Sequence, residues 1–177
     1  MTHRRTLVFL ALTMPLARAR AQAIDLEAPN PVRVSPRLIT SGQPTRGALA
    51  SLSKLGIQAV IYLAPGTVQD AVKDEPELLR QQGIEYVHIP VPFGAPAEQH
   101  FEAISSALVA RQDKKVLVHC QVNMRASTMV FLHRAITLRE EPSQAYEAVS
   151  RVWSPEGPWK RLVVDLLKGH GIDFQLL

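Results

Sequence analysis

The chain of 177 residues contains a single cysteine, Cys120, so it cannot form an internal disulfide. It also lacks an apolar run of the roughly 20 residues that a membrane-spanning helix needs. No repeat, low-complexity tract or interdomain linker appears. We predict neither a metal site nor a cofactor, because the histidines show no ligand-like spacing: His88, His100, His119, His133 and His170.

The first 23 residues differ from the rest of the chain. His3, Arg4 and Arg5 give a positively charged start, residues 6–16 are a short apolar run, and Ala21-Gln22-Ala23 is a small-x-small sequence. This pattern is typical of a secretory signal peptide. We expect a signal peptide over residues 1–23, a single domain over residues 24–177, and a periplasmic or secreted protein.

Charge is balanced once this segment is set aside. Four of the 20 basic residues lie in it and none of the 16 acidic ones, which leaves 16 of each sign. A neutral domain lacks the basic face that binding to nucleic acid or to a membrane surface requires. We expect a monomer with no nucleic-acid partner and no membrane span. In an oxidising compartment its lone cysteine would be an inert buried side chain or a functional thiol.

Strand and helix patterns alternate through the rest of the chain. Residues 25–36 are rich in proline and predict an extended arm, and residues 37–40 predict an edge strand. Residues 58–63 predict a central strand, because they are almost entirely apolar. Further strands are expected at 86–91 and 116–118. The helices between them are expected to run from Thr45 to Gly56 through Leu49, Leu52 and Leu55, from Pro76 to Gly83, and through Phe101, Ile104 and Leu108.

This alternation predicts an α/β fold with a mostly parallel central sheet and helices on both faces. Two C-terminal apolar stripes are interpreted as core packing. The first consists of Tyr146, Val149 and Trp153, and the second of Trp159, Leu162, Val163, Leu166 and Leu167.

The segment around Cys120 has the pattern of an anion site. Val116 to Val118 form a buried strand and helical spacing begins near Met124, so residues 120–124 form the turn between them. Backbone N–H groups converge in such a turn, and the helix N-terminus adds about half a positive charge. Arg125 can add a bidentate pair of donors. This positive field favours the thiolate form of Cys120.

His119-Cys120, the short loop, Arg125 and Ser127 resemble the signature of cysteine-dependent phosphatases, specifically small bacterial relatives of the dual-specificity type. The resemblance covers most of the chain. It implies a protein-tyrosine-phosphatase-like fold and hydrolysis of phosphate monoesters, on proteins or small molecules, through a cysteinyl-phosphate. It assigns the nucleophile to Cys120 and a donor to its sulfur to Ser127. His119 would orient the cysteine backbone and support the thiolate, and a merely packed histidine is the alternative. The substrate phosphate would be bound by Gln121, Val122, Asn123, Met124 and Arg125.

The loop departs from that family in length. Four residues separate Cys120 from Arg125 where the family usually has five, and rhodanese-type sulfurtransferases have the shorter loop. Asn123 stands nearest to the family's glycine, and asparagine tolerates a left-handed backbone better than most residues. Ser127 lies one place later than usual. A sulfurtransferase that carries a persulfide on Cys120 is therefore an alternative.

The general acid is the missing part. The family places an aspartate in the loop after the strand that ends at Val91, and residues 92–96 contain none. Asp70, Asp74 and Glu98 are the candidates. A catalytically weak anion-binding module is the third hypothesis, motivated by this absence. An enzyme without a strong acid would favour aryl over alkyl phosphates.

The tetrapeptide Ser41-Gly42-Gln43-Pro44 also resembles a segment of the family, one that lies close to the active-site end of the domain. A turn residue bonded to backbone is the alternative interpretation of Gln43.

Overall fold

The computed structural model describes residues 24–176. Within this range the chain forms one five-stranded sheet, whose strands are β1 (Val32–Ser35), β2 (Leu38–Ser41), β3 (Ala59–Tyr62), β4 (Glu85–His88) and β5 (Val116–His119). Their order in space is β1-β2-β5-β3-β4. β1 is antiparallel to β2, and the other neighbouring pairs are parallel. The predicted mostly parallel sheet is confirmed.

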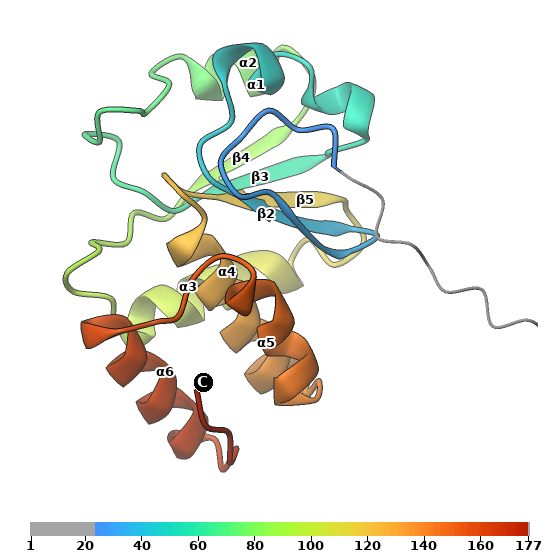
Figure 1. Cartoon of the computed structure of the whole chain (residues 1–177). Coiled ribbons are helices and arrows are strands. Elements are labelled where there is room, and N and C mark those ends of the chain that lie inside the picture. Colours follow the sequence, from blue (N-terminus) through green and yellow to red (C-terminus); the bar gives the residue numbers. More distant parts are fainter. Residues whose placement is uncertain (1–23, 177) are drawn as a thin grey trace, which may run out of the picture.

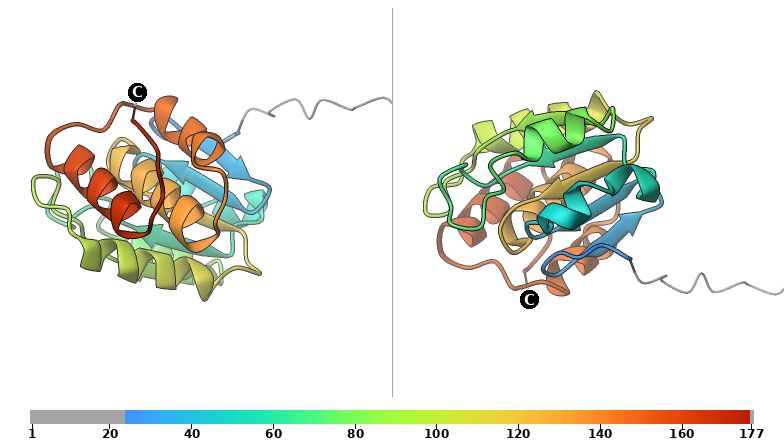
Figure 2. Two further views of the ribbon diagram at one scale, coloured as in Figure 1. Left: turned by 90° about the horizontal axis from the view of Figure 1, so that it is seen from below. Right: turned by 90° about the horizontal axis from the view of Figure 1, so that it is seen from above.

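Helical segments cover both faces of this sheet. They are α1 (Arg46–Leu49), the 3-10 turn η1 (Leu52–Leu55), α2 (Glu75–Arg80), α3 (Glu98–Val109), α4 (Met124–Leu132), the π-helical turn η2 (His133–Thr137), α5 (Pro142–Ser150) and α6 (Gly157–Gly169). α1 and α2 lie over one face, and α3, α4, α5 and α6 lie over the other (Figure 1 and Figure 2). The prediction of helices on both faces is also confirmed.

The core consists of two hydrophobic clusters, one on each face of the sheet. Alternation along β5 places Val116 and Val118 in the larger cluster and Leu117 in the smaller one. The residues predicted to form the apolar faces of α3, α5 and α6 are buried in the larger cluster: Phe101, Ile104, Leu108, Tyr146, Val149, Trp159, Leu162, Val163, Leu166 and Leu167. Trp153, from the same stripes, is partly buried against it.

The predicted edge strand at residues 37–40 is wrong in its position. β2 lies between β1 and β5, and the edge belongs to β1, within the segment predicted as an extended arm. β1 has only four residues, it lies between Pro31 and Pro36, and its pairing register shifts between Arg33 and Ser35. Flanking prolines are typical of an edge strand or of a loop, so this short pattern did not distinguish the two.

The single helix predicted after Thr45 is divided. α1 ends at Leu49, and η1 follows after two residues. Both expected end signals are present, because Thr45 Oγ1 accepts a hydrogen bond from the Ala48 amide at 3.2 Å and Gly56 closes η1 with a φ of 72°.

Three strands end side by side at the edge of the sheet where a site was predicted. Ser41 of β2 and Tyr62 of β3 are both register partners of His119 in β5. The turn after β5 therefore lies between the segment that follows β2 and the loop that follows β3. Ligands of α/β sheets bind at such carboxyl ends.

The predicted signal peptide, residues 1–23, lies outside the described residues. Among residues 24–176, no helix is long and apolar enough to cross a membrane.

His133 is a buried titratable group at the start of η2. Its Nδ1 lies 2.9 Å from Ser105 Oγ. Burial lowers the pKa of His133 from 6.5 to about 4, and the charge of Glu140 acts weakly in the opposite direction. The folded protein therefore holds this side chain neutral at pH values at which the unfolded chain protonates it.

Between pH 6.5 and about pH 4 the unfolded chain binds the extra proton. We predict that the free energy of unfolding falls as the pH is lowered through this window, by at most roughly 3 kcal/mol from this residue. Above pH 6.5 the contribution is fully present. Urea unfolding of the wild type and of His133→Gln across this pH range measures the contribution of His133 to the free energy of unfolding. An equal acid loss in both proteins would contradict the prediction.

Candidate active site

The turn that connects β5 to α4 comprises residues 120–125 and is called here the cysteine turn. Cys120 follows β5 directly, and its amide donates to the Ser41 carbonyl at 3.2 Å. Asn123, which precedes α4, has a φ of 73°. This left-handed conformation is uncommon outside glycine, and asparagine is among the residues that adopt it most readily. The residue nearest to the family's glycine therefore has a left-handed backbone.

Asn123 also ties the cysteine turn to the N-terminal segment. Its Nδ2 donates to the Asn30 carbonyl at 2.6 Å and to Thr40 Oγ1 at 3.1 Å. In return, Asn30 Nδ2 donates to the Val122 carbonyl at 3.1 Å. The side chains of Asn30 and Asn123 therefore each bond the cysteine turn to the N-terminal segment.

Gly42 allows the segment after β2 to approach the same turn. Its amide donates to the Pro29 carbonyl at 2.7 Å, and the amide of Gln43 donates to the Gln121 carbonyl at 3.0 Å. A Cβ at position 42 would lie 2.5 Å from the Gln121 oxygen and 2.7 Å from Pro29 Cβ. Only glycine fits at this distance.

Several backbone donors of the turn and of the first residues of α4 are left without a partner. Within residues 24–176, no acceptor is bonded to the amides of Gln121, Val122, Met124, Arg125 and Ala126. They lie around the N-terminus of α4, where the helix dipole adds positive charge. This arrangement is suited to binding an anion.

Arg125 is held beside the turn and is only 5% exposed. Its Nε donates to the Val91 carbonyl at 2.9 Å, and its Nη1 lies 3.4 Å from Gln121 Oε1. The guanidinium carbon lies 5.1 Å from the centre of the Phe93 ring, a cation–π distance. Its remaining donor capacity is available to a ligand on the turn.

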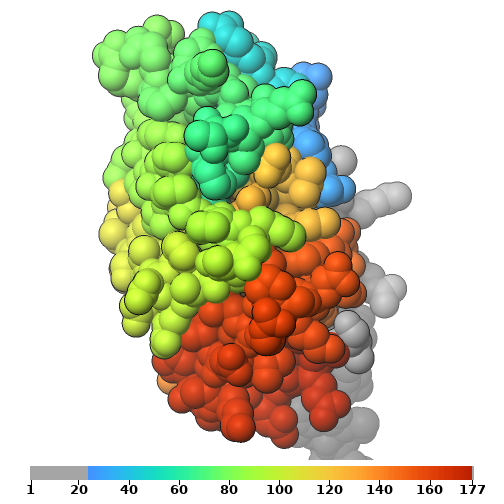
Figure 3. Space-filling view, turned by 90° about the vertical axis from the view of Figure 1, so that its left-hand side faces the viewer, coloured from blue at the N-terminus to red at the C-terminus, as the bar shows by residue number. Residues whose placement is uncertain are grey.

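Cys120 is a free thiol whose side chain has no exposed surface in this structure. The neighbouring Val122 is 41% exposed, so the turn itself reaches the surface. On that face the light-orange turn lies between the blue-green loop after β3 and the yellow-green loop after β4 (Figure 3). Contact between the sulfur and a substrate requires these surroundings to open.

His119 is buried on the other side of the sheet from the larger cluster. Its Nε2 lies 2.7 Å from Glu75 Oε1, and its ring stacks on Tyr62 with 4.7 Å between centroids. Sequence reasoning did not select Glu75, although this residue stands in the loop with the candidate acids. The signal was the position of Glu75 just before Pro76, at the start of a helix beside the site.

The comparisons with known proteins agree with this geometry. The model of the family described as "DSP-PTPase phosphatase fused to NAD+ Kinase" matches residues 23–160. The chain belongs to this DSP-PTPase family. The family assignment predicted from the cysteine motif is confirmed, and the enzyme class of the family is phosphoric monoester hydrolase.

Solved structures extend the likeness. A DUF442 protein from Shewanella putrefaciens CN-32, named as a candidate phosphatase, is 30% identical, with a TM-score of 0.74 over 81% of this chain and 92% of its own. Tk-PTP in the active form is 24% identical, with a TM-score of 0.63 over 80% and 95%. P. aeruginosa TpbA, as a cysteine-to-serine variant in complex with pTyr, is 21% identical, with a TM-score of 0.60 over 90% and 93%. These similarities confirm the dual-specificity-type fold. The comparison with curated proteins gave no match.

Ser127 of the DSP-PTPase motif is fully buried, and its hydroxyl donates to the Met124 carbonyl at 3.3 Å. Thr128 Oγ1 donates to the same carbonyl at 2.9 Å. In this structure the Ser127 hydrogen bond is made within α4 and not to the Cys120 sulfur. A donor role for Ser127 therefore requires rotation of its hydroxyl.

The three candidate acids differ in their contacts with the cysteine turn. Asp70 Oδ1 accepts a hydrogen bond from Gln121 Nε2 at 3.0 Å, so it touches the cysteine turn. Asp74 is bound by Arg46 at 2.6 Å, and this partner holds the pKa of Asp74 below its ordinary value. Glu98 is exposed at the start of α3, beside residues of α6. Only Asp70 of the three is bonded to the turn.

The pKa of Tyr62 is shifted by burial and by the charged groups at this edge of the sheet. Burial, then the charges of Glu75 and Asp70, raise the pKa of Tyr62 to about 12, with Arg125 acting in the opposite direction. Its hydroxyl is buried and has no partner among the described residues. Tyr62 therefore stays neutral at physiological pH.

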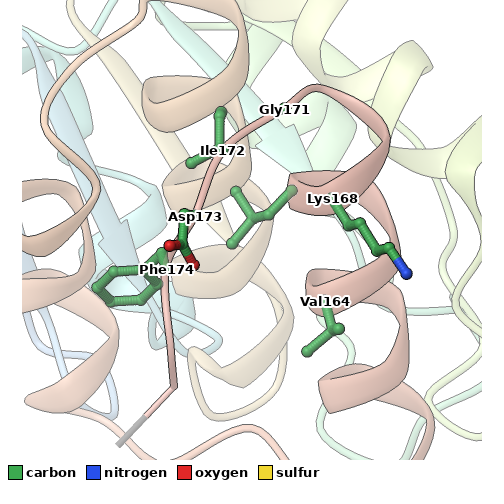
Figure 4. A pocket seen from close by; sticks show the side chains of 7 residues that line it. Val164, Lys168, Gly171, Ile172, Asp173 and Phe174 are labelled. Carbon is green, nitrogen blue, oxygen red and sulfur yellow. The ribbon is translucent and has the colours of Figure 1, made fainter.

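A hollow away from the cysteine turn contains none of the predicted site residues. A hollow of about 360 Å³ lies between α6 and the C-terminal segment (Figure 4) and is lined by Val164, Leu167, Lys168, Gly171, Ile172, Asp173 and Phe174. In the described part of the chain, no group of three or more His, Cys, Asp or Glu side chains is placed to hold a metal ion.

The close approach at Gly42 leads to a prediction. Gly42→Ala forces Gln121 or Pro29 to move, so we expect a loss of roughly 1–3 kcal/mol in unfolding free energy and weaker binding of inorganic phosphate. Gly47→Ala is the matched control, because a Cβ there meets its nearest neighbour at 3.9 Å. Urea unfolding and phosphate titration calorimetry measure the two effects. Equal behaviour of the two variants would show that the contact at Gly42 is not limiting.

Proposed function

We propose that this protein is an exported cysteine-dependent phosphatase, which hydrolyses phosphate monoesters through a cysteinyl-phosphate on Cys120. The observation that carries the proposal is the set of unpartnered amides around the cysteine turn, with Cys120 at one end and Arg125 at the other. Such donors stabilise the charge on the equatorial phosphate oxygens during transfer.

The reaction has two steps. The Cys120 thiolate attacks phosphorus, the phosphorus–oxygen ester bond breaks, and the leaving oxygen takes a proton from a general acid. Water then attacks the cysteinyl-phosphate, its proton passes to the same group, the sulfur–phosphorus bond breaks, and inorganic phosphate leaves. Gln121, Val122, Asn123 and Met124 contribute the turn around the phosphate, and Arg125 its guanidinium.

Substrate binding must also expose the sulfur. Gln121 bridges Asp70 and Arg125, at 3.0 Å and 3.4 Å. A phosphate offers acceptor oxygens that can replace Gln121 Oε1 beside the guanidinium. We infer that its arrival exchanges these contacts and opens the turn above Cys120.

Asp70 is the general acid in this proposal. It is exposed, it follows β3 at the carboxyl edge of the sheet, and it is hydrogen-bonded to a residue of the turn. Asp74 and Glu98 lack such a contact. The acid therefore comes from the loop after β3 and not from the loop after β4, which has no carboxylate in residues 92–96.

Two alternatives have an observation in their favour. The four-residue spacing between Cys120 and Arg125 suits a smaller group such as a terminal sulfur, which favours a sulfurtransferase with a Cys120 persulfide. The complete burial of Cys120 favours an anion-binding module without turnover. Membership of the DSP-PTPase family supports the phosphatase over both.

Cys120→Ser separates the three functions. We predict hydrolysis of an aryl phosphate by the wild type, a loss on the order of 10⁴-fold or more in the variant, and retained binding of inorganic phosphate. Rhodanese activity, measured with thiosulfate and cyanide, should be absent. Sulfur transfer without hydrolysis would establish the sulfurtransferase, and phosphate binding without either activity would establish the binding module.

Replacement of the acid should depend on the leaving group. Asp70→Asn should lower hydrolysis of alkyl phosphates by about 10²-fold and change that of aryl phosphates with acidic phenols much less. Asp74→Asn is the matched control, since Asp74 is paired with Arg46. Steady-state rates on a leaving-group series measure the difference. Equal losses in the two variants would remove Asp70 from this role.

Export is supported by the N-terminal sequence and by a family match that begins at residue 23. Expression of the full chain in a Gram-negative host, followed by fractionation and N-terminal sequencing, tests it. We expect periplasmic protein that begins at Ile24, and cytoplasmic protein that retains residues 1–23 would contradict export.

A further inference from the structure

A buried carboxylate–imidazole pair includes the residue that precedes the proposed nucleophile in the chain, and it has no part in the steps above. Glu75, at the start of α2, has a side-chain exposure of 2%, and His119, at the end of β5, has none. The distance between Glu75 Oε1 and His119 Nε2 is 2.7 Å. His119 is directly followed by Cys120 in the chain.

Gln43 completes the environment of the carboxylate. Its Nε2 donates to Glu75 Oε2 at 3.0 Å, and Gln43 is itself only 7% exposed. Gln43 belongs to the Ser41–Pro44 tetrapeptide after β2, so residues from three separate segments meet at one carboxylate. The alternative interpretation of Gln43, a turn residue bonded to backbone, accounts for its 3.5 Å contact with the Pro44 carbonyl and not for the bond to Glu75.

The two bonds explain how a carboxylate can be buried here. An isolated buried charge is strongly unfavourable, and a buried pair is tolerated only when donors satisfy its oxygens. Gln43 supplies a neutral donor to one oxygen and His119 supplies Nε2–H to the other. Because apolar side chains of similar volume would often be no less stable, stability alone does not account for the pair.

The pair fixes which nitrogen of His119 faces the carboxylate. With Nε2 bonded to Glu75, the other nitrogen, Nδ1, is the one nearer to the main chain that leads to Cys120. Nδ1 is buried and has no partner among the described residues. The Tyr62 ring, 4.7 Å away, holds the plane of the imidazole.

We propose that Glu75 is a positioning residue that acts through His119. Its carboxylate orients the ring and stabilises the imidazolium, which places a positive charge beside the Cys120 thiolate. The proposal rests on the proposed function only in taking Cys120 as the nucleophile, since the positioning itself requires no turnover.

Other titratable groups face the same space. From β3, Tyr62 stays neutral because its pKa is raised to about 12. From β4, His88 stacks on Tyr62 at 5.0 Å. Asp70 and Arg125 approach from the side of the cysteine turn, and their charges have opposite signs. Glu75 is the carboxylate in direct contact with His119.

Titration of the lone thiol tests the proposal. The ultraviolet absorbance of the thiolate is followed against pH, and the curve of the corresponding Cys120→Ser protein is subtracted to remove tyrosine. For Glu75→Gln we expect the midpoint to rise by up to about one pH unit, a tenfold smaller thiolate fraction below the midpoint. Loss of the Glu75 negative charge alone would move the midpoint down, so the direction distinguishes action through His119 from direct repulsion.

A double-variant cycle tests the path of the effect. His119→Asn should raise the midpoint as well, and adding Glu75→Gln to it should raise the midpoint no further, because both variants remove the same cation. Glu77→Gln is the matched control, since Glu77 lies in the same turn of α2, is 49% exposed and is paired with Arg80. Its midpoint should equal that of the wild type.

The contrary results are equally definite. A Glu75→Gln protein that unfolds more easily but keeps the wild-type midpoint, or additive shifts in the double variant, would make Glu75 a structural residue only. If Glu75→Gln does not fold, the protonation state of His119 in the wild type is measured instead, from the NMR resonances of its ring nitrogens. A neutral imidazole near pH 7 would overturn the proposal. The thiol titration does not require phosphatase activity. A protein without such activity would contradict the proposed function and leave the role of Glu75 still testable.

Discussion

The structure depends on one constraint, which is that several amides around the cysteine turn have no acceptor among the described residues. A turn with so many unpartnered donors is not stable by itself, because unpaired backbone groups lose hydrogen-bond energy. Its surroundings supply the missing stability through the hydrogen bonds with Asn30 and through the Gln43 amide, which donates to the Gln121 carbonyl. The N-terminal segment, β2 and the residues that follow β2 thus hold the cysteine turn in its conformation.

Burial of Cys120 is consistent with this picture. The sulfur belongs to a turn in which Gln121 is hydrogen-bonded to Asp70 and to Arg125. The Glu75–His119 pair is buried, with His119 at the end of β5, directly before this turn.

The sequence predicted those features of the structure that depend on residues close together in the chain. The apolar run before His119, the helical spacing after Met124 and the tolerance of asparagine for a left-handed backbone placed the cysteine turn correctly. β1 was missed because two prolines enclose four residues that become a strand only by pairing with β2. The partnership of Glu75 with His119 joins positions 44 residues apart, and that of Asp70 with Gln121 joins positions 51 apart. Local patterns contain no information on such contacts, which follow from strand order.

A crystal structure of the protein with bound orthovanadate tests the central claim most directly. We predict that the equatorial oxygens of vanadate accept hydrogen bonds from the amides of the cysteine turn and from Arg125. The Cys120 sulfur should be bonded to vanadium, and the bonds of Gln121 to Asp70 and Arg125 should be broken. Vanadate bound elsewhere, or absent from a turn in which Cys120 stays covered, would contradict the account.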